Sequence, residues 1–311
     1  MKRLPVLCIV FVMLFSACNL TATPAAPTQP VQEEPSPSPV PPTDTPEPTA
    51  TPEPSPTPLP PTDTPTPLPP TDTPTPLPPT DTPVPPTPTV DLAAAMQSAN
   101  IVLYEDLFFS RYVKTALDEA GYNYTDVGDR LGTFQSELLS DTKWDLVIAA
   151  AEGRGGVQGE FFDYIYQQLE SGASVIMELW ILDWVAGGRI QPILDECGID
   201  FQANWVNPSN RGVFWTDSAH PIANEPNQVS LTRFTLFWEG DIGDLVSLTP
   251  GSSATILGSA YDSNASRDGL ITLCYDGRLL LQTFSTHDHP EETMVQLWQN
   301  YVYFMLSNRF R

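Results

Sequence analysis

The stretch from Trp144 to Trp180 constrains the fold of this chain most strongly. It contains two apolar runs of strand length, DLVIAAA at 145–151 and SVIMELW at 174–180. Unbroken apolar runs of this length are typical of strands that are buried on both faces of a sheet. Between the two runs, apolar residues recur at helical spacing from Phe161 to Leu169. The pattern predicts a βαβ unit with parallel strands and a right-handed crossover.

Further strand and helix patterns alternate on both sides of this unit. Strands are predicted at 101–106, 122–129 and 199–206, and helices at 111–120, 131–141 and 188–197, with Ser110 as the expected cap of the first helix. Later strands at 254–262, 269–276 and 278–285 include a hairpin turn at Asp276-Gly277, and a long helix ends the chain. We predict an α/β fold: a flavodoxin-like, open, mostly parallel sheet with helices on both faces and a β-rich insertion in the second half.

The N-terminal residues 1–18 read as an export signal. Lys2 and Arg3 precede an apolar stretch from Leu4 to Phe15, which is too short to span a bilayer as a finished helix. Phe15-Ser16-Ala17-Cys18 resembles a bacterial lipobox, in which the cysteine is lipidated and becomes the new N-terminus. An ordinary cleaved signal with a coincidental cysteine is the alternative. We expect Cys18 to anchor the protein in the lipid bilayer of a bacterial cell membrane, facing outside.

Residues 19–90 have the composition of a disordered tether. Of the 35 prolines in the chain, 28 lie here, and the motif PTDTPTPLP begins at Pro61 and again at Pro70. Such a segment has too little apolar surface to offset the entropy of ordering. In the extended polyproline II form, about 70 residues reach about 200 Å. We expect a stalk that holds one globular domain, residues 91–311, away from the membrane.

The charge of this domain excludes one class of partner. It carries 30 acidic and 12 basic residues. An acidic surface of this kind repels the phosphate backbone, so no nucleic acid partner is expected. The domain has two cysteines, Cys197 and Cys274, and the sequence leaves open whether they form a disulfide.

Acidic side chains follow three of the predicted strands: Glu105 with Asp106, then Glu152, then Glu178. Ligands of open parallel sheets bind at the carboxyl ends of the strands. Glu152 precedes the glycine-rich loop GRGG, which lets a ligand approach the backbone closely. The loop matches neither nucleotide-binding fingerprint, so we expect no nucleotide and no other cofactor. The alternative is that each acid is simply solvated at a strand end.

The segment THDHPEE, at 286–292, is the densest polar cluster of the domain. His287 and His289 beside carboxylates have the donor types of a divalent metal site. The same residues also suit the start of the final helix, with Pro290 and Glu291 in its first turn. Whether a metal binds is left unknown.

The order of the elements, the HPI at His220 to Ile222 and the HPE at His289 to Glu291 resemble the class I glutamine amidotransferase-like superfamily. Catalytic members carry a cysteine on a sharp turn after a central strand, completed by a histidine and a glutamate spaced as HxE. The matching turn here falls near Glu178 to Trp180, which offers neither cysteine nor serine. The resemblance therefore implies the fold without a nucleophile and without catalytic residues, because acyl transfer then has no first step.

Three functions follow as expectations, the last of them a structural cell-envelope spacer with no specific ligand. The first is a lipoprotein that displays a non-catalytic domain for binding a carbohydrate or an envelope protein. The second is a carboxylate- or metal-dependent hydrolase of envelope or extracellular glycans, with Glu152 and Glu178 as an acid/base pair. Tryptophans near the strand ends suit stacking on sugar rings. The candidate ligand pocket comprises Glu105, Glu152, Glu178, Trp180, His287, His289 and Glu291.

Overall fold

The computed structural model describes residues 91–311, except 154–155, 210–211, 233–234, 236 and 262–264. Within these residues, ten strands form one sheet whose main path runs β2-β1-β3-β4-β10-β9-β7-β5. The strands are β1 (Ile101–Glu105), β2 (Thr125–Gly128), β3 (Leu146–Ala150), β4 (Ser174–Glu178), β5 (Ile199–Val206), β6 (Phe214–Trp215), β7 (Asp241–Leu248), β8 (Thr255–Ser259), β9 (Gly269–Cys274) and β10 (Leu279–Gln282).

The first half of the sheet is parallel. β2, β1, β3, β4 and β10 pair side by side in the same direction, which is the flavodoxin-like order with β10 as the fifth strand. The second half is antiparallel: β9 and β10 form the predicted hairpin, β7 and β5 extend the path, and β8 with β6 branches from β9. The predicted fold class is confirmed. Strand β7 was not predicted, because Asp244 and a glycine interrupt its apolar pattern.

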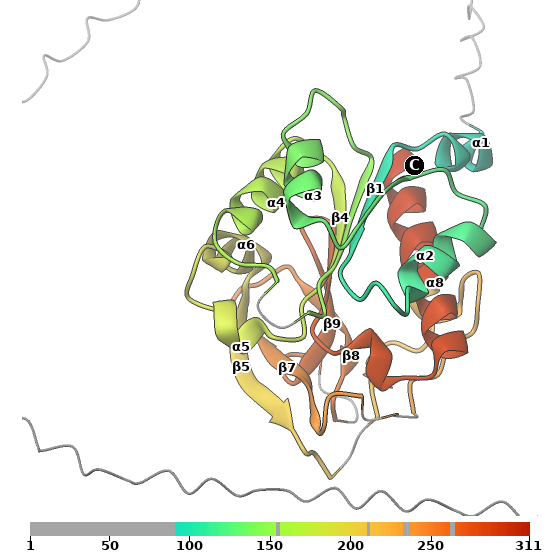
Figure 1. Ribbon diagram of the computed structural model, residues 1–311. Helices are drawn as coiled ribbons and strands as arrows, with labels where there is room; N and C mark the ends of the chain where they lie inside the picture. Colours follow the sequence, from blue (N-terminus) through green and yellow to red (C-terminus); the bar gives the residue numbers. More distant parts are fainter. Residues whose placement is uncertain (1–90, 154–155, 210–211, 233–234, 236, 262–264) are drawn as a thin grey trace, which may run out of the picture. The chain divides into compact units, whose positions relative to one another are not determined.

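Helices cover both faces of the sheet (Figure 1). One face carries α1 (Leu92–Gln97), α2 (Tyr112–Glu119), α7 (Pro221–Asn224) and α8 (Glu291–Phe310). The other carries α3 (Leu131–Leu138), α4 (Glu160–Glu170), α5 (Leu182–Val185) and α6 (Gln191–Cys197). A short 3-10 turn, η1 (Thr286–Asp288), joins β10 to α8. None of the helices described is long and apolar enough to span a bilayer.

Two hydrophobic cores follow from this layering. β1, β3 and β4 are buried at every residue, as strands covered on both faces should be. Alternate residues of one strand enter different cores: Val147 and Ala149 pack towards α3 and α4, whereas Leu146 and Ile148 pack towards α2 and α8. The β3–α4–β4 unit has parallel strands, as the sequence predicted.

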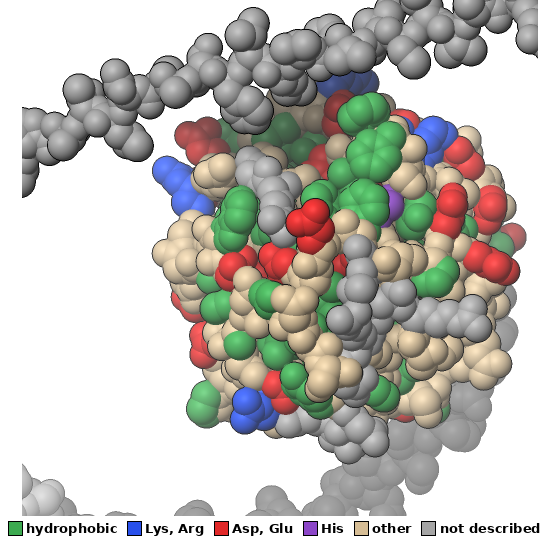
Figure 2. Space-filling view, turned by 60° about the horizontal axis from the view of Figure 1, so that its bottom comes forward, with side chains coloured by type: hydrophobic (Ala, Val, Ile, Leu, Met, Phe, Trp, Pro, Cys, Tyr) green, Lys and Arg blue, Asp and Glu red, His purple; other side chains and the backbone are tan. Residues whose placement is uncertain are grey.

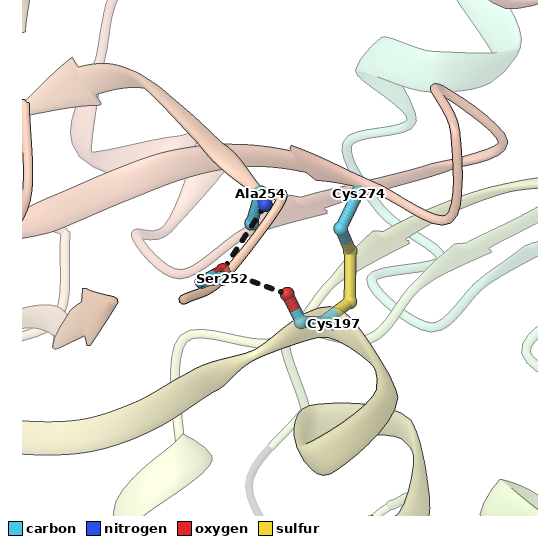
Figure 3. Close-up of a disulfide and its surroundings, with 4 residues drawn as sticks. All are labelled: Cys197, Ser252, Ala254 and Cys274. Atoms are coloured by element: carbon cyan, nitrogen blue, oxygen red, sulfur yellow. Dashed lines mark hydrogen bonds between the residues drawn. A yellow bond between two sulfur atoms is a disulfide. The ribbon is translucent and has the colours of Figure 1, made fainter. Parts of the chain in front are cut away.

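A disulfide joins Cys197 at the end of α6 to Cys274 at the end of β9, with a Cα–Cα distance of 5.2 Å (Figure 3). Ser252 lies beside it, and its hydroxyl donates to the Cys197 carbonyl at 3.2 Å and accepts from the Ala254 amide at 3.1 Å. The sequence left open whether these cysteines pair, and the structure shows that they do. The bond links α6 to β9, in the antiparallel half of the sheet.

Candidate functional site

Polar side chains converge where β1, β3, β4 and β10 end, as the parallel order requires. Glu105 and Glu178 are the last residues of β1 and β4, Gln282 is the last of β10, and Glu152 follows β3 by two positions. η1 then crosses these strand ends and adds Ser285, Thr286 and His287 to the same place. All of these side chains are buried. The sequence-predicted acids are therefore brought together, but inside the protein.

His287 and Glu152 form the centre of this buried cluster. The Glu152 carboxylate accepts hydrogen bonds from the His287 ring Nδ1, the Ser285 hydroxyl and, at 3.1 Å, the His287 backbone amide. The other ring nitrogen, Nε2, lies 2.8 Å from the Ser110 carbonyl oxygen. A carbonyl oxygen can only accept, so Nε2 must carry hydrogen, and an ionised Glu152 requires hydrogen on Nδ1 as well. With Glu152 ionised, His287 is therefore an imidazolium that pairs with it.

The electrostatics of the cluster agree with this protonation. Burial lowers the pKa of His287, but the hydrogen bond and charge of Glu152 raise it more, so the pKa of His287 lies above its ordinary value. The rings of Tyr112 and Phe237 lie against the imidazole, with centroids at 4.2 and 5.4 Å. Both nitrogens are therefore occupied, and aromatic rings pack on the imidazole.

Glu178 lies beside this pair, in a setting that favours its protonated form. Its side chain is fully buried, and Oε1 accepts from the Thr286 amide at 2.6 Å and from Gln282 Nε2 at 3.3 Å. Burial, and then the charge of Glu152, raise the pKa of Glu178 well above its ordinary value. Among the described residues, its Oε2 has no hydrogen-bond partner. Burial and the neighbouring charge thus both favour the protonated form of Glu178, which solvent does not reach.

Further acids with raised pKa values lie around the cluster. Burial raises the pKa of Asp244 to about 8 and those of Asp106 and Asp288 to about 6. Asp244 Oδ2 accepts from the Asp183 amide at 2.9 Å, and Asp288 Oδ1 accepts from the Trp238 amide at 3.2 Å. Sequence reasoning missed Asp244 and the hydroxyl of Ser285. An aspartate within the otherwise apolar strand β7 was the available signal for Asp244.

Glu105 and Asp106 fix the loops around the cluster. Glu105 accepts from the amides of Val113 and Lys114 at 2.8 and 3.1 Å and from Arg111, so it caps α2 in place of the predicted Ser110. Burial raises the pKa of Glu105 to about 7.

Asp106 shapes the glycine-rich loop after β3. Its carboxylate accepts from the amides of Glu152 and Gly153 at 2.9 and 2.8 Å. A Cβ at Gly153 would lie 2.8 Å from Asp106 Oδ2. The glycine thus admits the close approach of Asp106, whereas the sequence led us to expect a ligand at this loop.

The turn after β4 has no features of a nucleophile elbow. Leu179 and Trp180 are buried, and none of residues 174–185 has a left-handed φ. Trp180 Nε1 donates to the Glu152 carbonyl at 2.7 Å, and its ring stacks on Trp238 with centroids 5.0 Å apart. Trp180 therefore packs in the interior against Glu152 and Trp238, and its ring has no exposed face that a ligand could contact. The two cysteines among the described residues form the disulfide, so neither has a free thiol that could act as a nucleophile.

His289 and Glu291, the HxE pair of the resemblance, lie in different environments. His289 is buried, with its ring 5.2 Å from that of Phe284. Glu291 is exposed in the first turn of α8, in a separate surface depression that Glu119 also lines. The described residues contain no group of three or more histidine, cysteine or acidic side chains that could hold a metal. Both ring nitrogens of His287 already have partners, Glu152 and Ser110, so His287 has no free nitrogen with which to bind a metal.

An open groove lies next to the buried cluster. Its volume is about 690 Å³, and it is lined by Leu107, Phe109, Val206, Phe237, Trp238, Glu239 and Asp241. Phe237 contacts both the exposed ring of Phe109, at 6.3 Å, and the buried ring of His287. On the side of the domain seen in Figure 2, hydrophobic and acidic side chains lie next to one another. The predicted pocket residues thus lie beneath this groove or away from it, and aromatic residues from two loops form its surface.

No protein-family model and no curated protein sequence matches this chain. Similar solved structures include a protein described as a GMP synthase component, from Thermoplasma acidophilum, with a TM-score of 0.41 and 12% identity over 68% of this chain and 96% of that one. PurLQS from Thermotoga maritima has a TM-score of 0.39 and 13% identity, covering 68% and 98% of the two chains. A glutamine amidotransferase from Thermotoga maritima has a TM-score of 0.38 and 11% identity, covering 68% and 96%. At this level of similarity, the fold assignment rests on the strand order of the chain itself.

Proposed function

We propose that this protein is a lipid-anchored, extracytoplasmic binding protein whose amidotransferase-like domain recognises carbohydrate without catalysing a reaction on it. The observation that carries the proposal is the state of the strand-end cluster. Leu179, buried, stands at the turn where the resemblance places a nucleophile, and His287 is saturated by Glu152 and Ser110. Covalent catalysis needs an activated nucleophile and a base with a free nitrogen.

The hydroxyl groups near His287 do not replace the missing nucleophile. Ser285 is buried, donates to Glu152 and accepts from the His287 amide at 3.2 Å. Thr286 is also buried, and its Oγ1 accepts from Trp298 and Gln282, both at 3.1 Å. Each hydroxyl is thus committed to holding η1 in place.

The structure does not favour the hydrolase alternative. A glycosidase needs two carboxyl groups that face the scissile bond across an open cleft. Glu152 is only 3% exposed and is bonded by His287 and Ser285, whereas Glu178 is fully buried. Their role is to close the strand ends, and the groove lies outside them.

The groove supports carbohydrate as the ligand. Sugar-binding sites combine aromatic faces, which pack on the apolar side of the ring, with a few polar groups that fix its hydroxyls. Phe109 and Phe237 supply exposed aromatic faces, and Glu239 and Asp241 supply carboxylates at the same groove. The pair Val206–Asp241 joins β5 to β7, so part of the groove is built on the sheet.

The cell-surface location rests on the sequence and on the disulfide. Residues 1–18 read as a lipoprotein signal, and residues 19–90 as a tether. The Cys197–Cys274 bond suits the oxidising conditions outside the cytoplasm. Together they support a domain held on a stalk at the outer side of the membrane.

A binding-and-recovery experiment tests the proposal. The full-length protein in detergent is incubated with a panel of immobilised glycans and peptidoglycan fragments, and the bound material is then eluted and analysed by mass spectrometry. We expect retention of at least one glycan, which is recovered intact. Phe237→Ala should weaken binding about tenfold or more, by loss of a stacking face. Leu139→Ala, at an exposed apolar side chain in the loop after α3, is the matched control and should bind normally. Cleaved products that disappear in Glu152→Gln would contradict the proposal.

A further inference from the structure

Two loops carry the exposed phenylalanines of the groove. Phe109 lies in the loop after β1, residues 106–111, and is 61% exposed, whereas Phe237 lies in the loop before β7 and is 42% exposed. The centroids of the two rings are 6.3 Å apart. Rings as exposed as these bury little apolar surface, so they gain little free energy that could fix them in place. Their arrangement therefore depends on contacts made elsewhere in the two loops.

One residue of η1, His287, bonds to both loops. Its Nε2 donates to the carbonyl of Ser110 at 2.8 Å, directly after Phe109 in the chain. Its own backbone carbonyl accepts from the hydroxyl of Thr235 at 2.6 Å, two positions before Phe237. The imidazole also packs against the Phe237 ring, with centroids 5.4 Å apart. His287 thus contacts each loop beside its exposed phenylalanine.

Asp288, the next residue of η1, holds the second loop at two further points. Its backbone carbonyl accepts from the Thr235 amide at 2.6 Å, and its side chain accepts from the Trp238 amide at 3.2 Å. Trp238 itself lines the groove. The second loop is therefore bonded to η1 on both sides of Phe237.

The turn that makes these contacts is fixed from the interior of the domain. Glu178 accepts from the Thr286 amide at 2.6 Å, and Glu152 accepts from the His287 amide at 3.1 Å. Both acids are buried, at or just beyond the ends of central strands. A buried amide that loses its acceptor is costly, so these bonds hold η1 firmly. The sheet thus sets the position of η1, and η1 sets the position of the two loops.

We infer that His287 is a positioning residue for the groove, because its Nε2 and its backbone carbonyl tie the Phe109 loop to the Phe237 loop. The inference rests on the proposed carbohydrate-binding function and adds a residue on which that binding depends. His287 is buried and acts through the two phenylalanines.

Two substitutions of His287 separate its bond to the loop from its bond to Glu152. The amide nitrogen of glutamine can replace Nε2 and donate to Ser110, whereas that of asparagine can replace Nδ1 and donate to Glu152. The full-length variants in detergent are titrated calorimetrically with an N-acetylglucosamine hexamer, a neutral sugar. We expect His287→Asn to weaken binding about tenfold, as the loss of one hydrogen bond can do, and His287→Gln to weaken it about threefold or less.

A role of His287 in stability alone predicts the opposite order. His287→Gln leaves the buried Glu152 without its ring partner, so this variant should unfold at a lower urea concentration than His287→Asn. The less stable variant should therefore bind the hexamer more tightly. Binding that follows stability would overturn the inference.

Thr235 gives a second test, which leaves the buried cluster intact and so does not depend on the folding of the His287 variants. Thr235 is exposed, and Thr235→Val removes the hydroxyl that donates to the His287 carbonyl, whereas the control Thr235→Ser keeps it. In the ligand-free protein, Thr235→Val should raise amide hydrogen exchange at 237–240 about fivefold, and Thr235→Ser should not. Equal exchange in both variants would overturn the inference. Failure of the wild type to bind any glycan would refute the proposed function, while the exchange rates would still decide whether His287 holds this loop.

Discussion

At the scale of single residues, several acids lie buried or partly buried near one edge of the sheet. Glu105, Asp106, Glu178, Asp244 and Asp288 all have pKa values raised chiefly by burial. His287 supplies the imidazolium that lies among them. A buried carboxyl group with a raised pKa is neutral at moderate pH, which lowers the cost of placing so many acids together.

These pKa values predict that the domain is most stable in mild acid. A carboxyl group whose pKa is raised in the folded state binds more protons when folded than when unfolded. The stability of the folded protein therefore falls as pH rises from about 4, the ordinary carboxyl pKa, to about 8, the highest of the raised values. The raised pKa of His287 acts in the same direction, above its ordinary value. Asp118 and Asp126 have lowered pKa values, because of Lys114 and Arg111 respectively, and therefore lose their contribution below about pH 4.

Urea denaturation between pH 4 and pH 8 measures this effect. The free energy of unfolding should fall as pH rises, by about 1.4 kcal/mol for each unit of pKa difference that a group contributes. Asp244→Asn removes the acid whose pKa is raised to about 8 and should flatten the slope. Asp276→Asn, at an exposed hairpin residue, is the control and should leave the slope unchanged. A free energy of unfolding that increases over this range would show that the acids are charged.

The sequence predicted part of this cluster for a simple reason. Glu105, Glu152 and Glu178 each follow an apolar run, and parallel strands end at one edge, so their meeting could be foreseen. What could not be foreseen is that η1 folds back over the strand ends and buries them. That depends on long-range hydrogen bonds from Thr286 to Glu178 and from His287 to Glu152, which leave no local pattern in the sequence.

At the scale of elements, local patterns were reliable where burial alone decides the structure. The β3–α4–β4 unit and the β9–β10 hairpin, with left-handed φ at Asp276 and Gly277, follow their sequence signals. The cap of α2 was predicted wrongly, because Glu105, from the end of the preceding strand, reaches the helix amides in place of Ser110. A distant carboxylate can replace a local cap, and a sequence pattern shows only the local one.

The disulfide should contribute substantially to the stability of the antiparallel half. It closes a loop with a sequence separation of 77 residues. Loss of such a cross-link typically costs about 2–4 kcal/mol, mainly because the unfolded chain gains freedom. We expect Cys197→Ala/Cys274→Ala to lower the free energy of unfolding by this amount in urea. The wild type denatured with a reducing agent should match the variant. Identical curves for the wild type with and without reductant would mean that the bond does not form in the protein.

At the scale of the whole molecule, we propose a non-catalytic domain on a lipid anchor. The fold retains the strand-end site of an open α/β sheet, but η1, Trp180 and the loop that carries Trp238 fill it. The groove that we propose as the binding site therefore lies outside this cluster, on side chains of the surrounding loops. A long stalk would let this surface reach glycans away from the membrane.

The proposed anchor is tested by cell fractionation. Cys18→Ser should move the protein from the membrane fraction to the soluble extracytoplasmic fraction or the medium, because the lipid attachment site is lost. Cys8→Ser, in the apolar part of the leader, is the matched control and should leave the protein in the membrane fraction. Retention of Cys18→Ser in the membrane at the wild-type level would refute lipidation at this residue.

The central claim is that His287 is locked as an imidazolium and cannot serve as a catalytic base. Nuclear magnetic resonance of the ¹⁵N-labelled histidine rings tests it most directly, with His287 assigned by its proximity to the Tyr112 ring. His220, whose pKa is lowered by burial, is the internal control and should be neutral at pH 7. The account predicts that both ring nitrogens of His287 still carry protons at that pH. A neutral His287 with one free nitrogen at pH 7 would contradict it.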